Sequence, residues 1–214
     1  MAVKLTYFGH VAARGFPIRL ALRAAGVPFE DDRVDAAAFN ALRGGPGNYS
    51  DAVPLGQLPV VTIGGRVFVE SVQVSRWAAR QIPAGAPHQL YPSDALAALV
   101  VDEVLGVLDE AWSKLPNMRQ FPDAAELKPR REAWAADVSV RFFKHIERRL
   151  AEAGGPFVLG AEPSLADVWL LAFAMQVPNY DYVPPGLLDA YPAIARAVAA
   201  TRAHDVYKKF GEPN

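Results

Sequence analysis

Hydrophobic and polar positions follow two different periods along the chain, and the change occurs near residue 83. Before that point, short apolar runs with the alternation of strands are interleaved with helical segments. After it, the apolar spacing is helical throughout, and the proline-rich stretch 83–92 between the two regions is typical of a linker. We therefore expect one domain over residues 1–82 and a second, all-helical domain over residues 93–214.

Four short apolar segments in the first domain are predicted to form strands: Val3–Phe8, Phe29–Val34, Pro59–Ile63 and Val67–Val69. The first two should be parallel, because a helical segment lies between them. The last two flank Gly64-Gly65 and should form an antiparallel hairpin, because both central residues of a type I′ turn need a positive φ. With its helices, the region predicts a βαβ-ββα order, which is the thioredoxin-like α+β plan.

Three helices are predicted in this domain: Ile18–Ala25, Asp35–Arg43 and Ser71–Ile82. Pro17 should open the first helix, and Gly26 should end it in a left-handed conformation. Asp35 and Ser71 are expected to be the N-cap residues of the second and third helices.

The second domain carries four predicted helices: Ser93–Leu115, about Ala124–Ala153, Ser164–Gln176 and Pro192–His204. Its apolar runs, such as Val168–Val177, are too short to span a bilayer, so we expect no membrane association. The first residues enter a strand pattern directly and show no signal peptide, which predicts a cytoplasmic protein.

Charge and cysteine content exclude several functions. With 22 basic and 23 acidic residues the net charge is −1, which argues against nucleic-acid binding. The chain has no cysteine, so disulfides, thiolate metal ligands and cysteine nucleophiles are excluded, and any reacting thiol must belong to a substrate. The four histidines show no metal-ligand spacing, and no metal is expected.

Three local features could bind a small thiol peptide. Pro59 at the start of an apolar strand suggests either an ordinary trans turn or a cis Leu58–Pro59 bond, and the cis form would present the Leu58 backbone to an extended peptide. Glu70-Ser71 lies at the start of a helix whose N-terminus could hold a carboxylate, although a serine at this position is more often a simple cap. Tyr7 ends the first strand, where its hydroxyl could stabilise a thiolate or simply lie at the rim of the core.

The order and spacing of these features resemble the glutathione transferase family. The resemblance rests on Tyr7, Arg14-Gly15, the GQLPVV segment at 56–61 and Glu70-Ser71, and it extends to Ser164-Leu165-Ala166-Asp167, which looks like the capping box of the family's second domain. It covers nearly the whole chain. It implies the thioredoxin-like and all-helical domains already inferred, with glutathione as co-substrate, and a homodimer.

Within the family, the chain looks like the tyrosine type and most like the sigma class, because no serine or cysteine occurs from Leu5 through Phe16. Carried over by the resemblance, Tyr7 would activate the glutathione sulfur. The residues expected to bind glutathione are Arg14, Phe39, Arg43, Gln57, Leu58, Pro59, Glu70, Ser71 and Asp102. Asp102 would reach the partner subunit's glutathione, and Phe39 stands where the sigma class usually has tryptophan.

The pocket for an apolar electrophile is expected to be lined by Phe8, His10, Leu105, Leu108, Trp112 and Phe210. For Leu105 and Leu108, a place in the plain helical core is an equal alternative, and His10 could simply be exposed. The segments Gly9–Ala13 and Gly44–Val53 are longer than the usual sigma pattern, so the pocket should differ in shape.

The expected function is glutathione transfer to apolar electrophiles, in a detoxification role. Two alternatives stay open: a non-catalytic structural or ligand-carrying protein of the same fold, as in lens crystallins, and a glutathione-dependent isomerase. The sequence does not name the electrophile, nor does it separate conjugation from isomerisation or peroxidase activity.

Overall fold

A computed structural model describes residues 1–9 and 13–211 of the chain. The described chain divides into two compact units. The N-terminal unit comprises Met1–Leu90 together with the C-terminal residues from Lys209 on, and the helical unit comprises Tyr91–Lys208.

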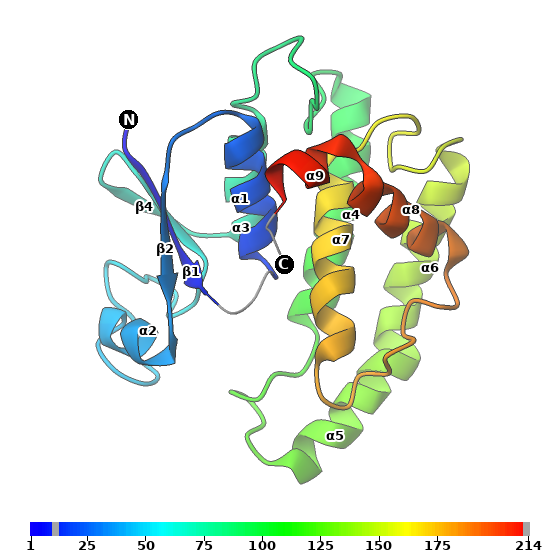
Figure 1. Cartoon of the computed structure of the whole chain (residues 1–214). Coiled ribbons are helices and arrows are strands. Elements are labelled where there is room, and N and C mark those ends of the chain that lie inside the picture. The colour runs from blue at the N-terminus through cyan, green and yellow to red at the C-terminus, as the bar shows by residue number, and fades with distance from the viewer. Residues whose placement is uncertain (10–12, 212–214) are drawn as a thin grey trace. The chain divides into compact units, whose positions relative to one another are not determined.

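The N-terminal unit is built on one mixed four-stranded sheet (Figure 1). Its elements are β1 (Val3–Phe8), α1 (Gly15–Ala24), β2 (Glu30–Val34), α2 (Ala36–Leu42), β3 (Val60–Ile63), β4 (Arg66–Phe68) and α3 (Ser71–Ala79). The strand order is β2-β1-β3-β4, with β1 parallel to β2 and antiparallel to β3, and with β3 antiparallel to β4. The predicted thioredoxin-like plan is confirmed.

Local signals in the sequence explain most of these boundaries. Gly64 and Gly65 have φ values of 56° and 85°, as the predicted hairpin requires. Asp35 caps α2 by accepting a hydrogen bond from the backbone N–H of Ala38 at 2.8 Å. One prediction is shifted: α1 begins at Gly15 instead of Ile18, because Pro17 fits within the first helical turn, where its missing N–H costs nothing.

Ser71 was predicted to cap α3, and this is wrong. The N-cap is Glu70, which has a left-handed backbone (φ 66°) and makes no side-chain capping bond. Ser71 is the first residue inside the helix. Its hydroxyl is therefore not used to terminate the helix.

The two faces of the sheet have different partners. Figure 1 shows α1 and α3 beside each other, with α2 apart from them. Because side chains alternate along a strand, Leu5 and Tyr7 of β1 face α1, whereas Thr6 and Phe8 point to the opposite face. That opposite face carries a small apolar cluster, made of Val34, Phe39, Val53 and Val60 with Phe8, Leu58, Val67 and Val69 packed against them.

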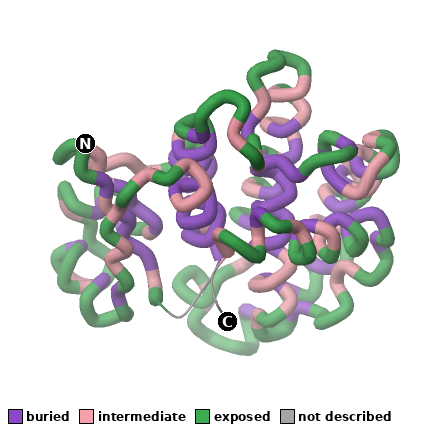
Figure 2. Tube along the Cα trace, turned by 45° about the horizontal axis from the view of Figure 1, so that its top comes forward, coloured by how far each residue is buried: buried purple, intermediate pink, exposed green. Residues whose placement is uncertain are grey.

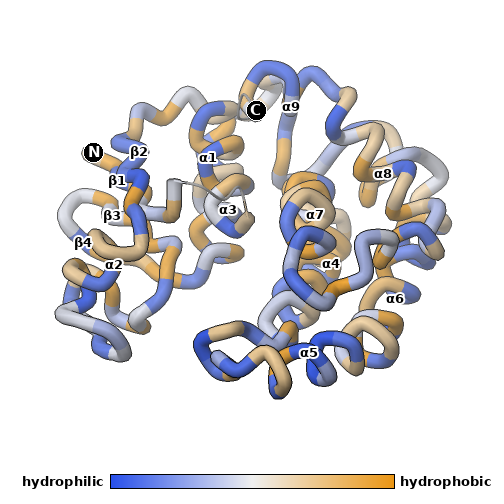
Figure 3. Tube along the Cα trace, turned by 60° about the horizontal axis from the view of Figure 1, so that its bottom comes forward, coloured by the Kyte–Doolittle hydropathy of each residue, from blue (hydrophilic) through white to orange (hydrophobic). Residues whose placement is uncertain are grey.

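The helical unit contains no strand among its described residues. Its elements are α4 (Ala95–Ser113), α5 (Ala124–Ala133), a π segment (Trp134–Val138), α6 (Ser139–Glu152), α7 (Leu165–Gln176), a 3₁₀ turn (Val177–Asn179), α8 (Pro192–Ala203) and α9 (Asp205–Phe210), whose last two residues belong to the N-terminal unit. Helix α7 is almost entirely apolar and buried, whereas α5 carries many hydrophilic residues (Figure 3). In both units, buried residues follow the helices and strands, and exposed residues dominate the connections (Figure 2).

The helix predicted over about 124–153 is present as one continuous helical run, but it is not α-helical throughout. Its path is divided into α5, a five-residue π segment and α6. The indole N–H of Trp134, in the π segment, donates to the carbonyl oxygen of Ala111 at 3.1 Å, and Trp134 is 2% exposed. The wider turn thus coincides with the packing of a large side chain against α4, which periodicity alone does not reveal.

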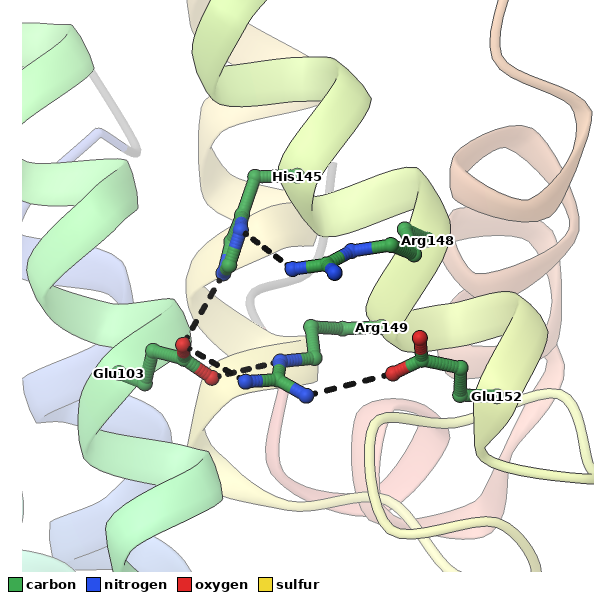
Figure 4. A network of polar contacts seen from close by, with 5 residues as sticks. All are labelled: Glu103, His145, Arg148, Arg149 and Glu152. Carbon is green, nitrogen blue, oxygen red and sulfur yellow. Dashed lines mark hydrogen bonds and ion pairs between the residues drawn. The ribbon is translucent and has the colours of Figure 1, made fainter.

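A polar network joins α4 to α6 within the helical unit (Figure 4). The carboxylate of Glu103 accepts two hydrogen bonds from the guanidinium of Arg149, at 2.7 and 2.9 Å, and lies 3.2 Å from His145. Hydrogen bonds from Arg149 are the largest influence on the Glu103 carboxyl and lower its pKa, against a smaller effect of burial. Because the pair is bidentate, it fixes the two helices in register better than a single contact would.

No helix in the described ranges combines the length and the apolar character that crossing a bilayer requires.

Candidate functional site

Tyr7 lies at the C-terminal end of β1 and is only 5% exposed. Its ring rests directly on the first turn of α1, because a Cβ atom placed on Gly15 would come within 2.3 Å of the ring carbon Cδ1. Only glycine allows this approach without displacing the ring. The first turn of α1 therefore fixes the tyrosine ring, and this contact explains why a glycine stands at position 15.

The Leu58–Pro59 peptide bond is cis, which decides between the two alternatives left open by the sequence. Pro59 is buried and leads directly into β3, whose first residue, Val60, pairs with Thr6. The corner is thus next to the end of β1 that carries Tyr7. The Leu58 side chain packs against the apolar cluster on the α2 face of the sheet.

The N-terminus of α3 brings a cation to Ser71. Arg14 donates a hydrogen bond from Nη1 to the Ser71 hydroxyl over 3.4 Å, although the two residues are 57 positions apart. Ser71 is 8% exposed, and the preceding Glu70 is exposed with its backbone in the left-handed region. A guanidinium, a hydroxyl and a helix N-terminus without a side-chain cap together suit a carboxylate ligand.

Arg43 is a buried cation in the N-terminal unit, 6% exposed. It donates hydrogen bonds from Nε and Nη2 to Asn40 at 3.1 and 2.7 Å, and its guanidinium lies 4.8 Å from the ring centre of Phe39. Within the described residues, its Nη1 has no accepting atom. Arg43 and Phe39 thus form one contact group, whereas Gln57 is exposed.

Phe8 and Phe39 pack edge to face, with ring centres 5.3 Å apart. Both belong to the apolar cluster on the α2 face, so Phe8 points away from the side of the sheet on which α1 holds Tyr7. Phe8 is partly buried against this small core, and its expected contact with an electrophile stays a prediction.

Leu105 and Leu108 are completely buried in the helical unit, and Trp112 is 7% exposed. The Trp112 ring packs edge to face against Trp169 and Phe173, at 6.1 and 5.3 Å. The two leucines therefore lie in the core of the helical unit, which was one of the two alternatives for them. That these three residues line a substrate pocket stays a prediction.

Phe210 is placed at the far end of α1 from Tyr7. Its carbonyl oxygen accepts a hydrogen bond from Nη1 of Arg23 at 3.3 Å, and its ring lies 6.0 Å from that of His88. Tyr7 instead contacts Gly15, two helical turns away from Arg23. The structure does not bring Phe210 to Tyr7. His10 lies outside the described residues.

Asp102 belongs to the helical unit and accepts a hydrogen bond from the Tyr91 hydroxyl, which lies 2.9 Å from each carboxylate oxygen. Tyr91 is 6% exposed, so this bond anchors the start of the helical unit to α4. The expected contact of Asp102 with a partner subunit stays a prediction.

Sequence reasoning missed Arg19, which is 1% exposed and lies 5.8 Å from the ring centre of Tyr7. The expected helix began only at Ile18, so the sequence did not show that Arg19 and Gly15 share a face of α1, which begins at Gly15. It also missed that Arg14 contacts Ser71, because no local pattern relates two residues so far apart in the chain.

Comparison with known proteins gives a consistent result. The profile of the glutathione S-transferase N-terminal domain matches residues 3–80, and that of the C-terminal domain matches residues 109–213. A glutathione S-transferase of Anopheles gambiae is 27% identical over 193 residues, covering 90% of this chain and 87% of that protein. Glutathione S-transferase 1 of Ascaris suum is 24% identical, covering 97% and 94%.

Solved structures agree on the fold. Prostaglandin synthase D of Nilaparvata lugens superposes with a TM-score of 0.79 at 20% identity, covering 97% of this chain and 96% of that one. The monomeric glutathione S-transferase Na-GST-3 of Necator americanus superposes with a TM-score of 0.75 at 19% identity, covering 100% and 98%. With both domain profiles matched in order along the chain, the protein belongs to the glutathione S-transferase family.

Proposed function

We propose that this protein transfers glutathione to apolar electrophiles and that Tyr7 stabilises the glutathione thiolate. The observation that carries the proposal is the placement of the Tyr7 ring by Gly15 at the end of β1, beside the cis Leu58–Pro59 corner. Ligands bind at the carboxyl ends of strands in open α/β sheets, and Tyr7 lies at this end of β1. Its phenol could donate a hydrogen bond to the thiolate of a glutathione bound there.

Glutathione would be held by three different kinds of group. The Ser71 hydroxyl, the Arg14 guanidinium and the N-terminus of α3 suit the γ-glutamyl carboxylate, with Glu70 beside them for the ammonium group. The Leu58 backbone at the cis corner suits the cysteinyl peptide, which would pair as an added strand. Arg43 would supply positive charge for the glycyl carboxylate, to which Gln57 would also bind.

The chemical step follows from the acidity of the thiol. A free thiol with a pKa near 8.5 is only about 3% ionised at pH 7, and a hydrogen bond from the Tyr7 hydroxyl favours the ionised form. The thiol proton passes to solvent. The thiolate sulfur then forms a bond to the electrophilic carbon, and a displaced group leaves with the electron pair of the bond that breaks.

Replacing Tyr7 by phenylalanine tests this proposal. If Tyr7 lowers the thiol pKa by about two units, the thiolate fraction at pH 7, and with it kcat/KM, should fall about 25-fold. Glutathione affinity should change little, since the carboxylate contacts remain. Tyr182→Phe in the helical unit is the matched control and should keep its activity. Unchanged turnover of Tyr7→Phe with several electrophiles would contradict the mechanism.

The proposal extends to a tyrosine-type, sigma-like enzyme that acts as a cytoplasmic homodimer in detoxification. For the dimer, Asp102 would have to share its carboxylate between Tyr91 and the glutathione of a second copy. Sedimentation of the purified protein decides the assembly state. In a dimer, Asp102→Ala should weaken glutathione binding, and a monomer with full affinity would contradict this part of the proposal.

A further inference from the structure

Arg19 is a buried cation in the middle of α1, with 1% of its surface exposed. Its Nε donates to the Asp31 carboxylate of β2 at 2.7 Å. The other Asp31 oxygen accepts a hydrogen bond from Arg33 at 2.9 Å. Burying a guanidinium is costly unless it is paired, and Asp31 pairs the buried Arg19. Arg33, on the other side of Asp31, is partly exposed.

The network lies on the side of the sheet that carries Tyr7. In the parallel pairing of β1 with β2, Tyr7 is opposite Arg33 and Leu5 is opposite Asp31. Arg19 and Gly15 are four residues apart and therefore share a helical face. Gly15 touches the Tyr7 ring, and the Arg19 guanidinium lies 5.8 Å from the ring centre. One face of α1 thus provides both the space for the tyrosine ring and a positive charge against it.

The three charges leave an excess of one positive charge near the ring. Burial raises the pKa of the Asp31 carboxyl, but hydrogen bonds from Arg19 and Arg33 outweigh it, so the pKa is lowered overall and Asp31 stays ionised. Strand β3, on the other side of β1, has no charged residue, and Arg14 is turned to Ser71. Arg19, Asp31 and Arg33 are thus charged residues on the face of the sheet that carries Tyr7.

We infer that Arg19 is a positioning residue for Tyr7, which holds the ring and strengthens its hydroxyl as a hydrogen-bond donor to the glutathione thiolate. The inference rests on the proposed role of Tyr7. A cation near the ring stabilises the negative charge that develops on the phenol oxygen, which makes the O–H more acidic and a stronger donor, and it attracts the thiolate beyond it. Because Arg19 is buried, solvent screens this effect less than it would screen a surface charge.

The test is the apparent pKa of the glutathione thiol in its complex with the protein, titrated by ultraviolet absorption of the thiolate. Arg19→Met should raise that pKa by about 0.5 to 1 unit. Asp31→Asn should move it the opposite way, because it removes the negative charge and leaves two cations. Arg19→Lys should keep the pKa of the wild type, because it keeps the positive charge.

Arg23→Met is the matched control on the same helix. It should not shift the pKa of the bound thiol, since Arg23 contacts the Phe210 carbonyl.

Opposite shifts in Arg19→Met and Asp31→Asn support the inference, because loss of packing alone would not move the pKa in two directions. If Arg19→Met does not fold, Asp31→Asn and Arg19→Lys decide the question, and no shift in Asp31→Asn overturns the inference. A wild-type complex without thiolate, or a Tyr7→Phe variant that keeps it, overturns the proposed function itself. If Tyr7→Phe loses the thiolate but the charge variants match the wild type, only the role of Arg19 is wrong.

Discussion

Two helix N-termini in this protein are built in opposite ways. Helix α7 begins with a complete capping box, in which the Asp167 carboxylate accepts hydrogen bonds from the backbone N–H and the hydroxyl of Ser164, both at 2.8 Å. The second carboxylate oxygen accepts from the backbone N–H of Val158 at 2.9 Å. Helix α3 begins at Ser71 with no side-chain cap, behind a left-handed Glu70. One N-terminus is closed by its own chain, and the other is open.

The difference separates a structural cap from a binding site. The α7 start is completely buried, and its polar groups are satisfied internally, so nothing remains for a ligand. At α3, the first residue, Ser71, accepts a hydrogen bond from Arg14, a cation, so the helix start and the guanidinium both attract a negative group. The same local rule for helix starts therefore yields stability in one unit and a candidate site in the other.

The largest expected effect is the loss of the closed cap. Asp167→Ala removes the acceptor of three hydrogen bonds from completely buried surroundings, and it should lower the free energy of unfolding by about 3–5 kcal/mol. Urea denaturation at mildly acidic pH measures this free energy. The variant is first purified by its binding to glutathione, so that only folded protein is compared. A loss below about 1 kcal/mol, the size of an ordinary exposed cap, would show that the box is not structural.

The closed cap also predicts a pH dependence. Burial raises the pKa of Asp167 from 3.8 to about 6, against hydrogen bonds that lower it. Because the folded pKa lies above the unfolded one, this group stabilises the fold below about pH 4, and the contribution is lost as the pH rises through 6. The stability of the wild type relative to Asp167→Asn should therefore fall by about 3 kcal/mol between about pH 4 and 7. A constant difference over this range would contradict the raised pKa.

At the open N-terminus, the effect should appear in binding and not in stability. Ser71→Ala removes one hydroxyl from the proposed carboxylate site, which should weaken glutathione binding about tenfold, while unfolding changes by less than about 0.5 kcal/mol. Calorimetric titration with glutathione measures the affinity, and urea denaturation measures the free energy of unfolding. Ser75→Ala, one turn further along α3, removes a buried bond to the Val72 carbonyl and should show the reverse pattern. Equal affinity of Ser71→Ala and the wild type would contradict the site.

The smallest effect is expected at the exposed cap of α2. Asp35→Ala should cost about 1 kcal/mol in denaturant unfolding, the usual value of an exposed N-cap. Asp94→Ala, at the start of α4, makes the same 2.8 Å bond in the helical unit and should cost about as much. A much larger loss in either variant would show that these caps do more than end a helix.

Features encoded over a few residues could be predicted from the sequence. The hairpin at Gly64-Gly65, the Asp35 cap and the Ser164–Asp167 box each follow from residues no more than three positions apart. The fold plan follows from the order of such signals. The cis Leu58–Pro59 bond was an open alternative, because proline permits both isomers and the rest of the fold selects one.

Features that depend on distant residues could not be predicted. Arg14 meets Ser71 across 57 residues, and Arg19 meets Asp31 and Tyr7 only after α1 has packed on the sheet. Phe210 was expected to line the electrophile pocket, and its contacts with Arg23 and His88 did not follow from the sequence. Hydropathy records which side chains are apolar and not which neighbour they will meet.

The return of the chain to its first unit has a consequence for the order in which that unit is synthesised. Residues from Lys209 on belong with Met1–Leu90, so the helical unit is in effect an insertion within the N-terminal one. During synthesis, the ribosome must make every helix of Tyr91–Lys208 before the Phe210 carbonyl can reach Arg23. The unit that is translated first is therefore completed last.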